Sequence, residues 1–458
     1  MSFIFAIDEI NRNPSILPNV TLGYHAYDAC GDSNKAIKDT LQILSGNQRE
    51  APNYSCQERS KVAGFIGGRT SITTLPMAQV LSLYEYTQIS YGASNTELSD
   101  RKLYPYFFRT VQGDNVYYQA IVILLKYFGS NWVGIITSDD VTREKEIEEL
   151  SQVITSHGIC IEFSIQLSGN NEQNLDIVKK ATSQIFILCG EGSVSRAKLF
   201  TADPLIFQNI TLIICPSSIL GTIIHKTHML ILNGSLSFIL STENIPGFQS
   251  FLSSVKPSNR PRDPLLEDLW IIYLRCISPN RYKTKIFETL YMFTACKCTE
   301  EKDFSHIEVI IKHVTAYGVY TAVHVLAQAL HRMQEDSNRN YHEWNQGENV
   351  FKNKLHHYVK RVHYKDHAGK EIFFNDKGEL PDTLHLFKWE FRQDKGNLYV
   401  AKMSPGTINM SFPEDQQLQI YYEGTYWKNN QVSKEIYWTH NSNNSMKGFS
   451  FKCSLLDM

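Results

Sequence analysis

The sequence has no excess of charge of either sign. Its 45 lysine and arginine residues are nearly matched by 47 aspartate and glutamate residues, which gives a formal net charge of -2. Such a balance produces no electric field that would gather nucleic acid or anionic lipid. We therefore expect neither of these among the partners of the chain.

Long apolar segments are also missing. No apolar run approaches the roughly 18 residues that a membrane-spanning helix requires. The amino terminus, MSFIFAIDEI, lacks the basic start and the small-residue cleavage site of a signal peptide. Taken literally, the sequence predicts a chain with neither a transmembrane segment nor a signal peptide.

The motifs of common catalytic sites are absent. The sequence contains no HExxH zinc motif, no GxSxG nucleophile elbow, no Walker phosphate loop and no complete GxGxxG. The histidines of LHHYVKRVHYKDH have no zinc spacing, and the lysine and arginine residues among them indicate a solvated face. These histidines are His356, His357, His363 and His367. We predict no metal, no cofactor and no enzymatic activity.

Alternating strand and helix patterns are present over the first half of the chain. Strict alternation indicates right-handed crossovers onto a parallel sheet that has helices on both faces, so the predicted fold class is α/β. A chain of 458 residues is long enough for two compact lobes. The expected strands are 62–68, 87–92, 132–137, 159–167, 184–190 and 212–216, and the expected helices lie near 74–86, 114–128, 143–157, 172–181 and 193–200.

Two turns rich in glycine and hydroxyl groups follow neighbouring strands. QISYGASN contains Gly92 and Ser94, and GFIGGRTS contains Ser71. In open α/β sheets ligands bind beyond the carboxyl ends of the strands, where glycine lets the backbone approach and hydroxyls donate to anions. The two turns together would make a carboxylate cradle, but ordinary turn formation and helix capping would explain the same residues.

Asp114 opens the helix expected at 114–128. The simplest interpretation is that it is the N-cap of this helix. A second role, facing a cleft between the lobes, is compatible with the same position.

Cysteines and glycosylation motifs indicate an oxidising compartment. Cys30 and Cys56 flank one polar loop and Cys276 and Cys298 flank another, as in short-loop disulfides, although scattered reduced thiols are the alternative. Cys189 and Cys215 lie in apolar runs, where a free cysteine acts as a small hydrophobic residue. Asn-X-Ser/Thr motifs occur at Asn19, Asn53, Asn209, Asn233, Asn409 and Asn443.

Several longer segments resemble the ligand-binding ectodomain of class C G-protein-coupled receptors, and vomeronasal type 2 olfactory receptors in particular. The calcium-sensing and metabotropic glutamate receptors are similar as well. The resemblance covers almost the whole chain in the same order. It rests on FAIDEINRNPSILPNVTLGYHAYDAC, ISYGASNTELSDRKLYPYFFRTVQGD, YFGSNWVGIITSDD, GICIEFS, ENIPGFQSFL, YGVYTAVHVLAQALHRM, LHHYVKRVHY, IFFNDKGEL and YYEGTYWKNNQV.

The resemblance implies a Venus flytrap of the periplasmic-binding-protein-like type I. Two doubly wound parallel-sheet lobes are joined by three hinge strands and close around a ligand, which rearranges a receptor homo- or heterodimer. A G protein would act only through a membrane domain that the printed sequence lacks. The implied lobe 1 is 1–110 with 237–380, and lobe 2 is 111–236 with 381–430. Residues 431–458 form an atypical tail in place of the family's cysteine-rich domain.

The resemblance also implies a binding site for an amino acid-like or peptide ligand. Positions matching Ser71, Gly92 and Ser94 hold the ligand α-carboxylate in amino-acid-binding relatives, and Asp114 matches an acid that helps to hold the ammonium. Thr142 replaces a cleft tyrosine and Ser217 falls near a glutamate of the relatives, so the ammonium half of the site is thinned.

The implied disulfides agree with the spacing, Cys30 with Cys56 and Cys276 with Cys298. Cys160 matches a cysteine that bridges to the missing cysteine-rich domain. Because both ends differ from the family, we expect a truncated gene product or an incomplete gene model. The expected full-length form is a plasma-membrane chemosensory receptor with this region outside the cell. The alternatives are a soluble flytrap protein that binds a small molecule without signalling, and a periplasmic-binding-like enzyme or regulator.

Overall fold

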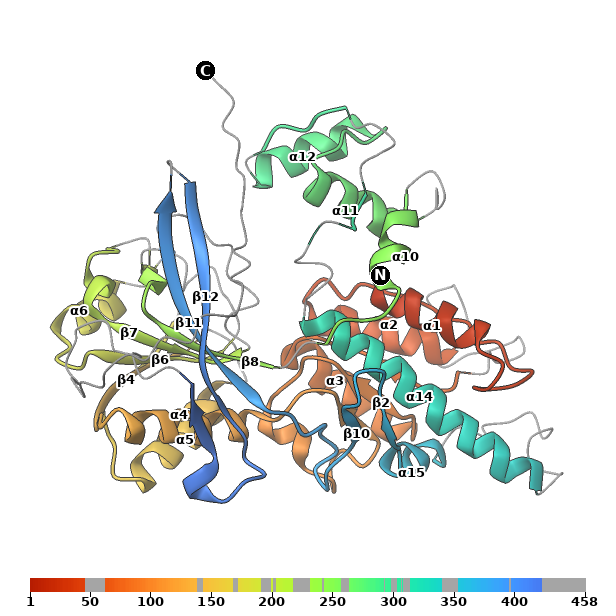
Figure 1. The fold of residues 1–458 in the computed structure, drawn as a ribbon, viewed down its shortest axis with the longest axis horizontal. Helices are drawn as coiled ribbons and strands as arrows, with labels where there is room; N and C mark the ends of the chain where they lie inside the picture. Colours follow the sequence, from red (N-terminus) through yellow and green to blue (C-terminus); the bar gives the residue numbers. More distant parts are fainter. Residues whose placement is uncertain are drawn as a thin grey trace.

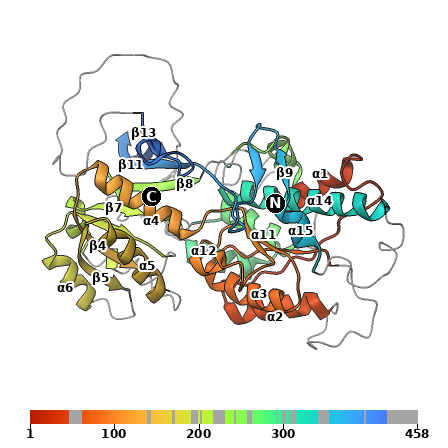
Figure 2. The same cartoon turned by 90° about the horizontal axis from the view of Figure 1, so that it is seen from below.

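The computed structural model has two α/β lobes that lie side by side in both views (Figure 1 and Figure 2). The structure describes residues 1–45, 62–137, 143–167, 172–190, 199–200, 203–216, 231–240, 243–256, 263–291, 293–297, 303–305, 307, 314–339, 353–394 and 397–421. The predicted α/β class and the two-lobe arrangement are confirmed.

Lobe 1 is built around a small parallel sheet. Its strands β1, β2 and β3 lie in this order, and Ile89 of β2 pairs with Ile66 and with Phe108. The apolar side chains of this sheet pack against α1 and α14 in one core. The elements of lobe 1 are α1 (Ser2–Arg12), α2 (Ser33–Ser45), β1 (Phe65–Ile66), α3 (Ser71–Leu83), β2 (Gln88–Ser90), η1 (Thr96–Ser99), β3 (Phe107–Arg109), α10 (Phe248–Ser254), α11 (Pro264–Leu274), α12 (Arg281–Tyr291), α14 (Val314–Arg339), α15 (Leu355–Lys360), β9 (His363–Lys365) and β10 (Glu371–Phe373).

Lobe 2 contains an eight-stranded sheet in the order β13-β12-β11-β8-β7-β6-β4-β5. The strands from β8 to β5 are parallel, whereas β11, β12 and β13 add antiparallel strands at one side. The elements of lobe 2 are α4 (Asp114–Tyr127), β4 (Trp132–Thr137), α5 (Arg143–Ser156), β5 (Cys160–Gln166), α6 (Glu172–Lys180), β6 (Ile185–Leu188), η2 (Ile206–Asn209), β7 (Thr211–Ile214), β8 (Leu236–Leu240), β11 (Leu384–Asp394), β12 (Asn397–Ile408), η3 (Glu414–Gln416) and β13 (Leu418–Ile420).

The sheet of lobe 2 is therefore mixed, with five parallel strands and an antiparallel extension of β11, β12 and β13. The β11–β12 hairpin rises steeply beside the parallel strands (Figure 1). The chain leaves lobe 2 after β8 and returns from lobe 1 in β11, which lies beside β8 and runs in the opposite direction. Strand β12 then pairs with β11 as an antiparallel hairpin.

The central strands of lobe 2 are buried on both faces. All four residues of β6 and all four of β7 are buried. Ile185 and Ile187 pack on one side of the sheet, while Phe186 and Leu188 pack on the other. This alternation explains why the sequence of a doubly covered strand is apolar without interruption.

The chain crosses between the lobes three times. The core residues change from lobe 1 to lobe 2 between Phe108 and Val111, and change back before Ile245. The third crossing follows Leu380. The second crossing differs from the predicted boundary at 237, because β8 (Leu236–Leu240) pairs with β7 and β11 in the sheet of lobe 2.

The cysteines match the sequence predictions only in part. Cys276 is disulfide-bonded, and its expected partner Cys298 lies outside the described residues. Cys30 carries a free, exposed thiol, and its expected partner Cys56 lies outside the described residues. The Lys35 ammonium donates a hydrogen bond to the Cys30 sulfur at 3.1 Å.

The glycosylation motifs lie mostly on the surface. Asn19, Asn209 and Asn233 are exposed, as glycan attachment requires. Asn409 is half-buried, and its amide nitrogen donates to the Thr383 hydroxyl at 3.1 Å. The motifs at Asn53 and Asn443 lie outside the described residues.

Within the described residues, no helix combines the length and the apolar character that crossing a bilayer requires.

Candidate functional site

The two turns picked out in the sequence lie against each other in lobe 1. Strands β1 and β2 are parallel neighbours, so their carboxyl ends reach the same edge of the sheet. The Ser90 hydroxyl donates to the Gly68 carbonyl oxygen at 2.7 Å, and the Asn95 amide donates to the Ser71 hydroxyl at 3.2 Å. The structure thus brings together three of the predicted site residues, Ser71, Gly92 and Ser94.

Gly92 makes this close approach sterically possible. A β-carbon at this position would lie 2.5 Å from the carbonyl oxygen of Arg69, nearer than real β-carbons approach any atom. Only glycine therefore allows the backbone of the second turn to pack on the backbone of the first. We name residues 67–71 and 92–96 together the cradle.

The hydroxyls of the cradle have different surroundings. Ser71 and Ser94 are both buried, with 4% and 7% of their surfaces exposed. The Ser71 oxygen accepts from Asn95, which leaves its own hydrogen to donate. Thr96 instead donates to the Glu149 carboxylate at 2.6 Å, across the gap to α5 of lobe 2.

Asp114 connects the cradle to lobe 2. Helix α4 begins at Asp114, and Gly113 in extended conformation is the N-cap, so the N-cap interpretation of Asp114 is wrong by one residue. The Gly113 carbonyl already accepts the first helical bond, from Val116 at 3.0 Å. The Asp114 amide donates to the Ser94 carbonyl oxygen at 2.8 Å. The start of α4 in lobe 2 is thereby bonded directly to the cradle in lobe 1.

The Asp114 side chain is buried between the lobes. Only 2% of its surface is exposed, and it stands at the positive end of the α4 dipole. Burial raises the pKa of Tyr117 and Tyr118, and the nearby Asp114 charge raises both pKa values further. The carboxylate therefore lies within electrostatic reach of both phenols, at the carboxyl edge of the lobe 2 sheet.

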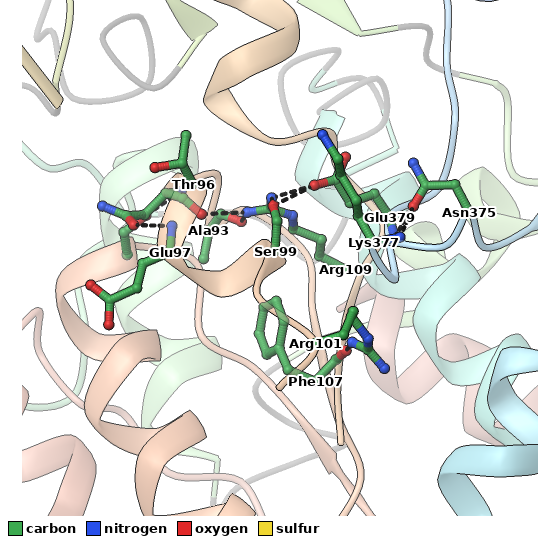
Figure 3. Close-up of polar contacts among 12 residues, drawn as sticks. Ala93, Thr96, Glu97, Ser99, Arg101, Phe107, Arg109, Asn375, Lys377 and Glu379 are labelled. Atoms are coloured by element: carbon green, nitrogen blue, oxygen red, sulfur yellow. Dashed lines mark hydrogen bonds and ion pairs between the residues drawn. The ribbon is translucent and has the colours of Figure 1, made fainter. Parts of the chain in front are cut away.

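A buried ion pair that the sequence did not reveal supports the backbone of the cradle. The Arg109 guanidinium at the end of β3 lies 2.5 Å from the Glu379 carboxylate, and the two side chains are 0% and 3% exposed (Figure 3). Arg109 also donates to the carbonyl oxygens of Ala93 and Asn95, at 3.1 and 2.9 Å. One guanidinium thus fixes the path of the cradle backbone.

The Glu379 carboxylate, which accepts from Arg109, also accepts a hydrogen bond from a serine hydroxyl. The Ser99 hydroxyl donates to Glu379 at 2.7 Å and also accepts from Arg109 at 2.5 Å. Burial alone would raise the pKa of Glu379, but the Arg109 charge and the hydrogen bonds from Ser99 and Gly113 outweigh burial and lower it. Glu379 is therefore ionised at neutral pH and balances the buried arginine.

The same network joins two hinge strands. The Arg109 amide donates to the Gly378 carbonyl oxygen at 2.9 Å, and the Leu380 amide donates to the Arg109 carbonyl oxygen at 3.0 Å. Further along, the Gln112 side-chain amide donates to the Asp382 carbonyl oxygen at 3.0 Å. Arg109 ends an apolar strand in YFFRTVQGD, which signals a paired buried charge, but its partner lies 270 residues away and no local pattern indicates it.

Two predicted cleft residues, Thr142 and Ser217, lie outside the described residues. The ends of β4, β6 and β7 belong to the described part of the lobe 2 edge, and Tyr118 of α4 interacts electrostatically with Cys189 and Cys215, which follow β6 and β7. The predicted site is thus described on its lobe 1 side and at Asp114.

Comparisons with known proteins identify one family over most of the chain. The family described as "Receptor family ligand binding region" matches residues 1–391. The extracellular calcium-sensing receptors of Sus scrofa and Homo sapiens are each 24% identical, over 98% of this chain and 44% of the receptor. Vomeronasal type-2 receptor 26 of Mus musculus is 28% identical over 72% of this chain and 39% of that receptor. The chain spans less than half the length of these relatives.

Proposed function

The chain belongs to the family of receptor ligand-binding regions, the class C G-protein-coupled receptor group with the calcium-sensing and vomeronasal type-2 receptors. From that premise we propose that it is the ligand-sensing part of a chemosensory receptor of vomeronasal type. Its ligand is an amino acid or a short peptide, bound between the lobes. The region acts by binding and lobe closure and carries out no catalysis.

The cradle supplies the groups that a carboxylate needs. Ser71 and Ser94 each have a hydroxyl hydrogen, and Gly92 lets the two turns that carry them pack against each other. Binding a carboxylate in a buried site removes its hydration shell. Hydrogen bonds from the protein make up for this loss only if the donors are already positioned before the ligand binds. Arg109 provides that positioning by holding the carbonyl oxygens of Ala93 and Asn95.

One observation carries the proposal: the hydrogen bond from the Asp114 amide to the Ser94 carbonyl oxygen. Through it the carboxylate-binding turn of lobe 1 and the first residue of α4 in lobe 2 form one unit. A ligand that rests on Ser94 therefore lies beside the buried Asp114 carboxylate. An α-amino acid has its ammonium and carboxylate groups at this short separation, which fits a donor turn next to an acid.

The ammonium side depends on fewer groups in this chain than in amino-acid-binding relatives. Thr142 and Ser217 replace larger polar residues at the matching positions, so Asp114 is the main acid proposed for this role. We therefore propose a ligand whose recognition rests chiefly on its carboxylate. A peptide carboxyl terminus satisfies this condition as well as a free amino acid does.

The test is a thermal-shift screen of the purified chain against free amino acids and short peptides. A ligand that binds only the folded state raises the melting temperature by mass action. Any ligand found is then compared with its carboxamide, in the wild type and in Ser94→Ala. Loss of affinity with the carboxamide in the wild type, and no such difference in Ser94→Ala, would support the cradle. The matched control is Ser254→Ala on the exposed end of α10, remote from the cradle.

Equal affinity for the acid and the carboxamide in the wild type would contradict carboxylate recognition.

We further propose that the complete receptor lies in the plasma membrane with this region outside the cell. There the closed lobes would rearrange a dimer and signal to a G protein through a membrane domain.

A further inference from the structure

Two buried cysteines lie side by side at the carboxyl ends of β6 and β7 in lobe 2. Cys189 follows β6 and Cys215 follows β7, with 0% and 2% of their surfaces exposed. Their sulfur atoms are 2.6 Å apart, with no covalent bond between them in this structure. A disulfide bond measures about 2.04 Å, so the two sulfurs are nearer to bonding distance than to the separation of independent thiols.

The sheet register enforces this closeness. Leu188 pairs with Ile214 in the parallel β6–β7 ladder, and the Cys215 amide continues the ladder by donating to the Leu188 carbonyl oxygen at 3.0 Å. Cys189 and Cys215 are thus the next pair along. Register partners in a pleated sheet point to the same face, and both cysteines pack in the same core cluster.

The backbone distances also fit a covalent link. Neighbouring strands lie about 4.8 Å apart, and disulfides join residues whose Cα atoms are about 4.4–6.8 Å apart. We propose that Cys189 and Cys215 form a cross-strand disulfide in the mature protein. This bond would tie together the carboxyl ends of β6 and β7.

The reaction needs an electron acceptor, for which we name a disulfide of the glutathione or protein type. Two thiols lose two protons and two electrons as the sulfur–sulfur bond forms, and the acceptor disulfide takes up both and becomes two thiols. An oxidising compartment supplies such acceptors. That compartment rests on the proposed receptor role, whereas the geometry of the pair does not.

The surroundings indicate when the bond would form. Burial raises the pKa of Cys189 well above its ordinary value, and the Cys215 thiol and the Glu146 and Asp114 charges raise it further. Tyr118 also interacts electrostatically with both cysteines, and burial raises its pKa as well. A buried thiol that stays protonated exchanges slowly, so the bond would form during folding, before the core closes over the strand ends.

A peptide map of the full chain tests the proposal directly. The chain is folded in a glutathione redox buffer, denatured with an alkylating agent but without reductant, and digested with trypsin. Cleavage yields peptides 181–196 and 199–226, each with one of the two cysteines and no other. Recovery of the two peptides as one covalently linked species supports the proposal. Recovery of both as alkylated free thiols overturns it, and leaves a thiol–thiol hydrogen bond in the core.

A stability measurement provides an independent readout. The double variant Cys189→Ala/Cys215→Ala is compared with the wild type after both have been unfolded and refolded with and without reductant, so that the reductant reaches the buried pair. A disulfide predicts a melting temperature roughly 5 to 10 °C higher for the oxidised wild type, and a difference that shrinks in reductant. The same difference in both conditions would overturn the proposal, because packing alone does not depend on reductant. Cys160→Ala is the control, since Cys160 is an exposed free thiol.

Discussion

The Thr96 hydroxyl donates a hydrogen bond of 2.6 Å to the Glu149 carboxylate. Thr96 belongs to the cradle of lobe 1, and Glu149 lies on α5 of lobe 2. This bond therefore joins the two lobes through side chains. A contact of this kind exists only while the lobes keep this relative orientation, so it biases the equilibrium between open and closed arrangements.

Thr96→Val should therefore shift the lobes toward an open arrangement. Losing one hydrogen bond to a partly exposed carboxylate costs roughly 0.5–1.5 kcal/mol, which corresponds to a two- to tenfold fall in the affinity of any ligand that binds the closed state. Small-angle scattering should show a larger radius of gyration. Thr155→Val on the same helix α5 is the control, because its hydroxyl bonds only within the helix. Equal scattering curves for Thr96→Val and the wild type would show that the Thr96–Glu149 hydrogen bond does not influence the relative orientation of the lobes.

Gly92→Ala should damage the cradle. The new β-carbon would lie 2.5 Å from the Arg69 carbonyl oxygen, so the two turns must move apart. Overpacking of this kind typically costs about 1–3 kcal/mol. We expect a lower urea midpoint and loss of any carboxylate ligand. Gly23→Ala is the matched control, since a β-carbon there would meet nothing within 4 Å. If Gly92→Ala behaved like Gly23→Ala, the cradle geometry described here would be wrong.

Arg109→Met should be among the most damaging substitutions in lobe 1. It leaves the Glu379 carboxylate buried without its cation and removes the donor from the carbonyl oxygens of Ala93 and Asn95. Removing one partner of a buried ion pair costs about 3–5 kcal/mol of unfolding free energy. Chemical denaturation followed by circular dichroism measures this loss.

The exposed pair of Lys365 and Glu371 provides the comparison. Its atoms are 3.8 Å apart and its side chains are 68% and 52% exposed, so Lys365→Met should cost less than about 1 kcal/mol. The double variant Arg109→Met/Glu379→Leu should be more stable than Arg109→Met alone, because it removes the unpaired charge. If the double variant were less stable than the single one, the charge would not be the source of the loss.

His356 should make the stability of lobe 1 depend on pH. Burial lowers the pKa of His356 to about 4, and the charges of His357 and Arg101 lower it as well. The unfolded chain takes up this proton near pH 6.5, and the folded chain does so only near pH 4. The unfolded state therefore binds more protons within this window, so stability is complete above pH 6.5 and falls as the pH drops toward 4.

His356→Leu should flatten this part of the stability profile, as measured by melting temperature between pH 7.5 and 4. The control is His363→Leu, whose side chain is 63% exposed in the wild type. An unchanged slope in His356→Leu would show that other groups cause the pH dependence.

Much of the α/β alternation could be predicted because it depends on local pattern. The strand β4 runs from Trp132 to Thr137 as predicted, and α4 and α5 each end one residue before the predicted limit. Long amphipathic or wholly apolar segments carry their periodicity within themselves. By contrast, β1 has only two residues where seven were expected, because strand length is decided by which neighbours are available for pairing.

The sequence by itself determined the fold class, the order of the elements and the position of the two glycine and serine turns. These follow from residue type, spacing and a resemblance that runs along the chain. Only the tertiary structure decided that Arg109 meets Glu379, that Thr96 reaches Glu149, and that Cys189 lies against Cys215. Each of these contacts joins segments that come together only after the sheets have formed. Their energies depend on burial and distance in the folded chain, which no local pattern encodes.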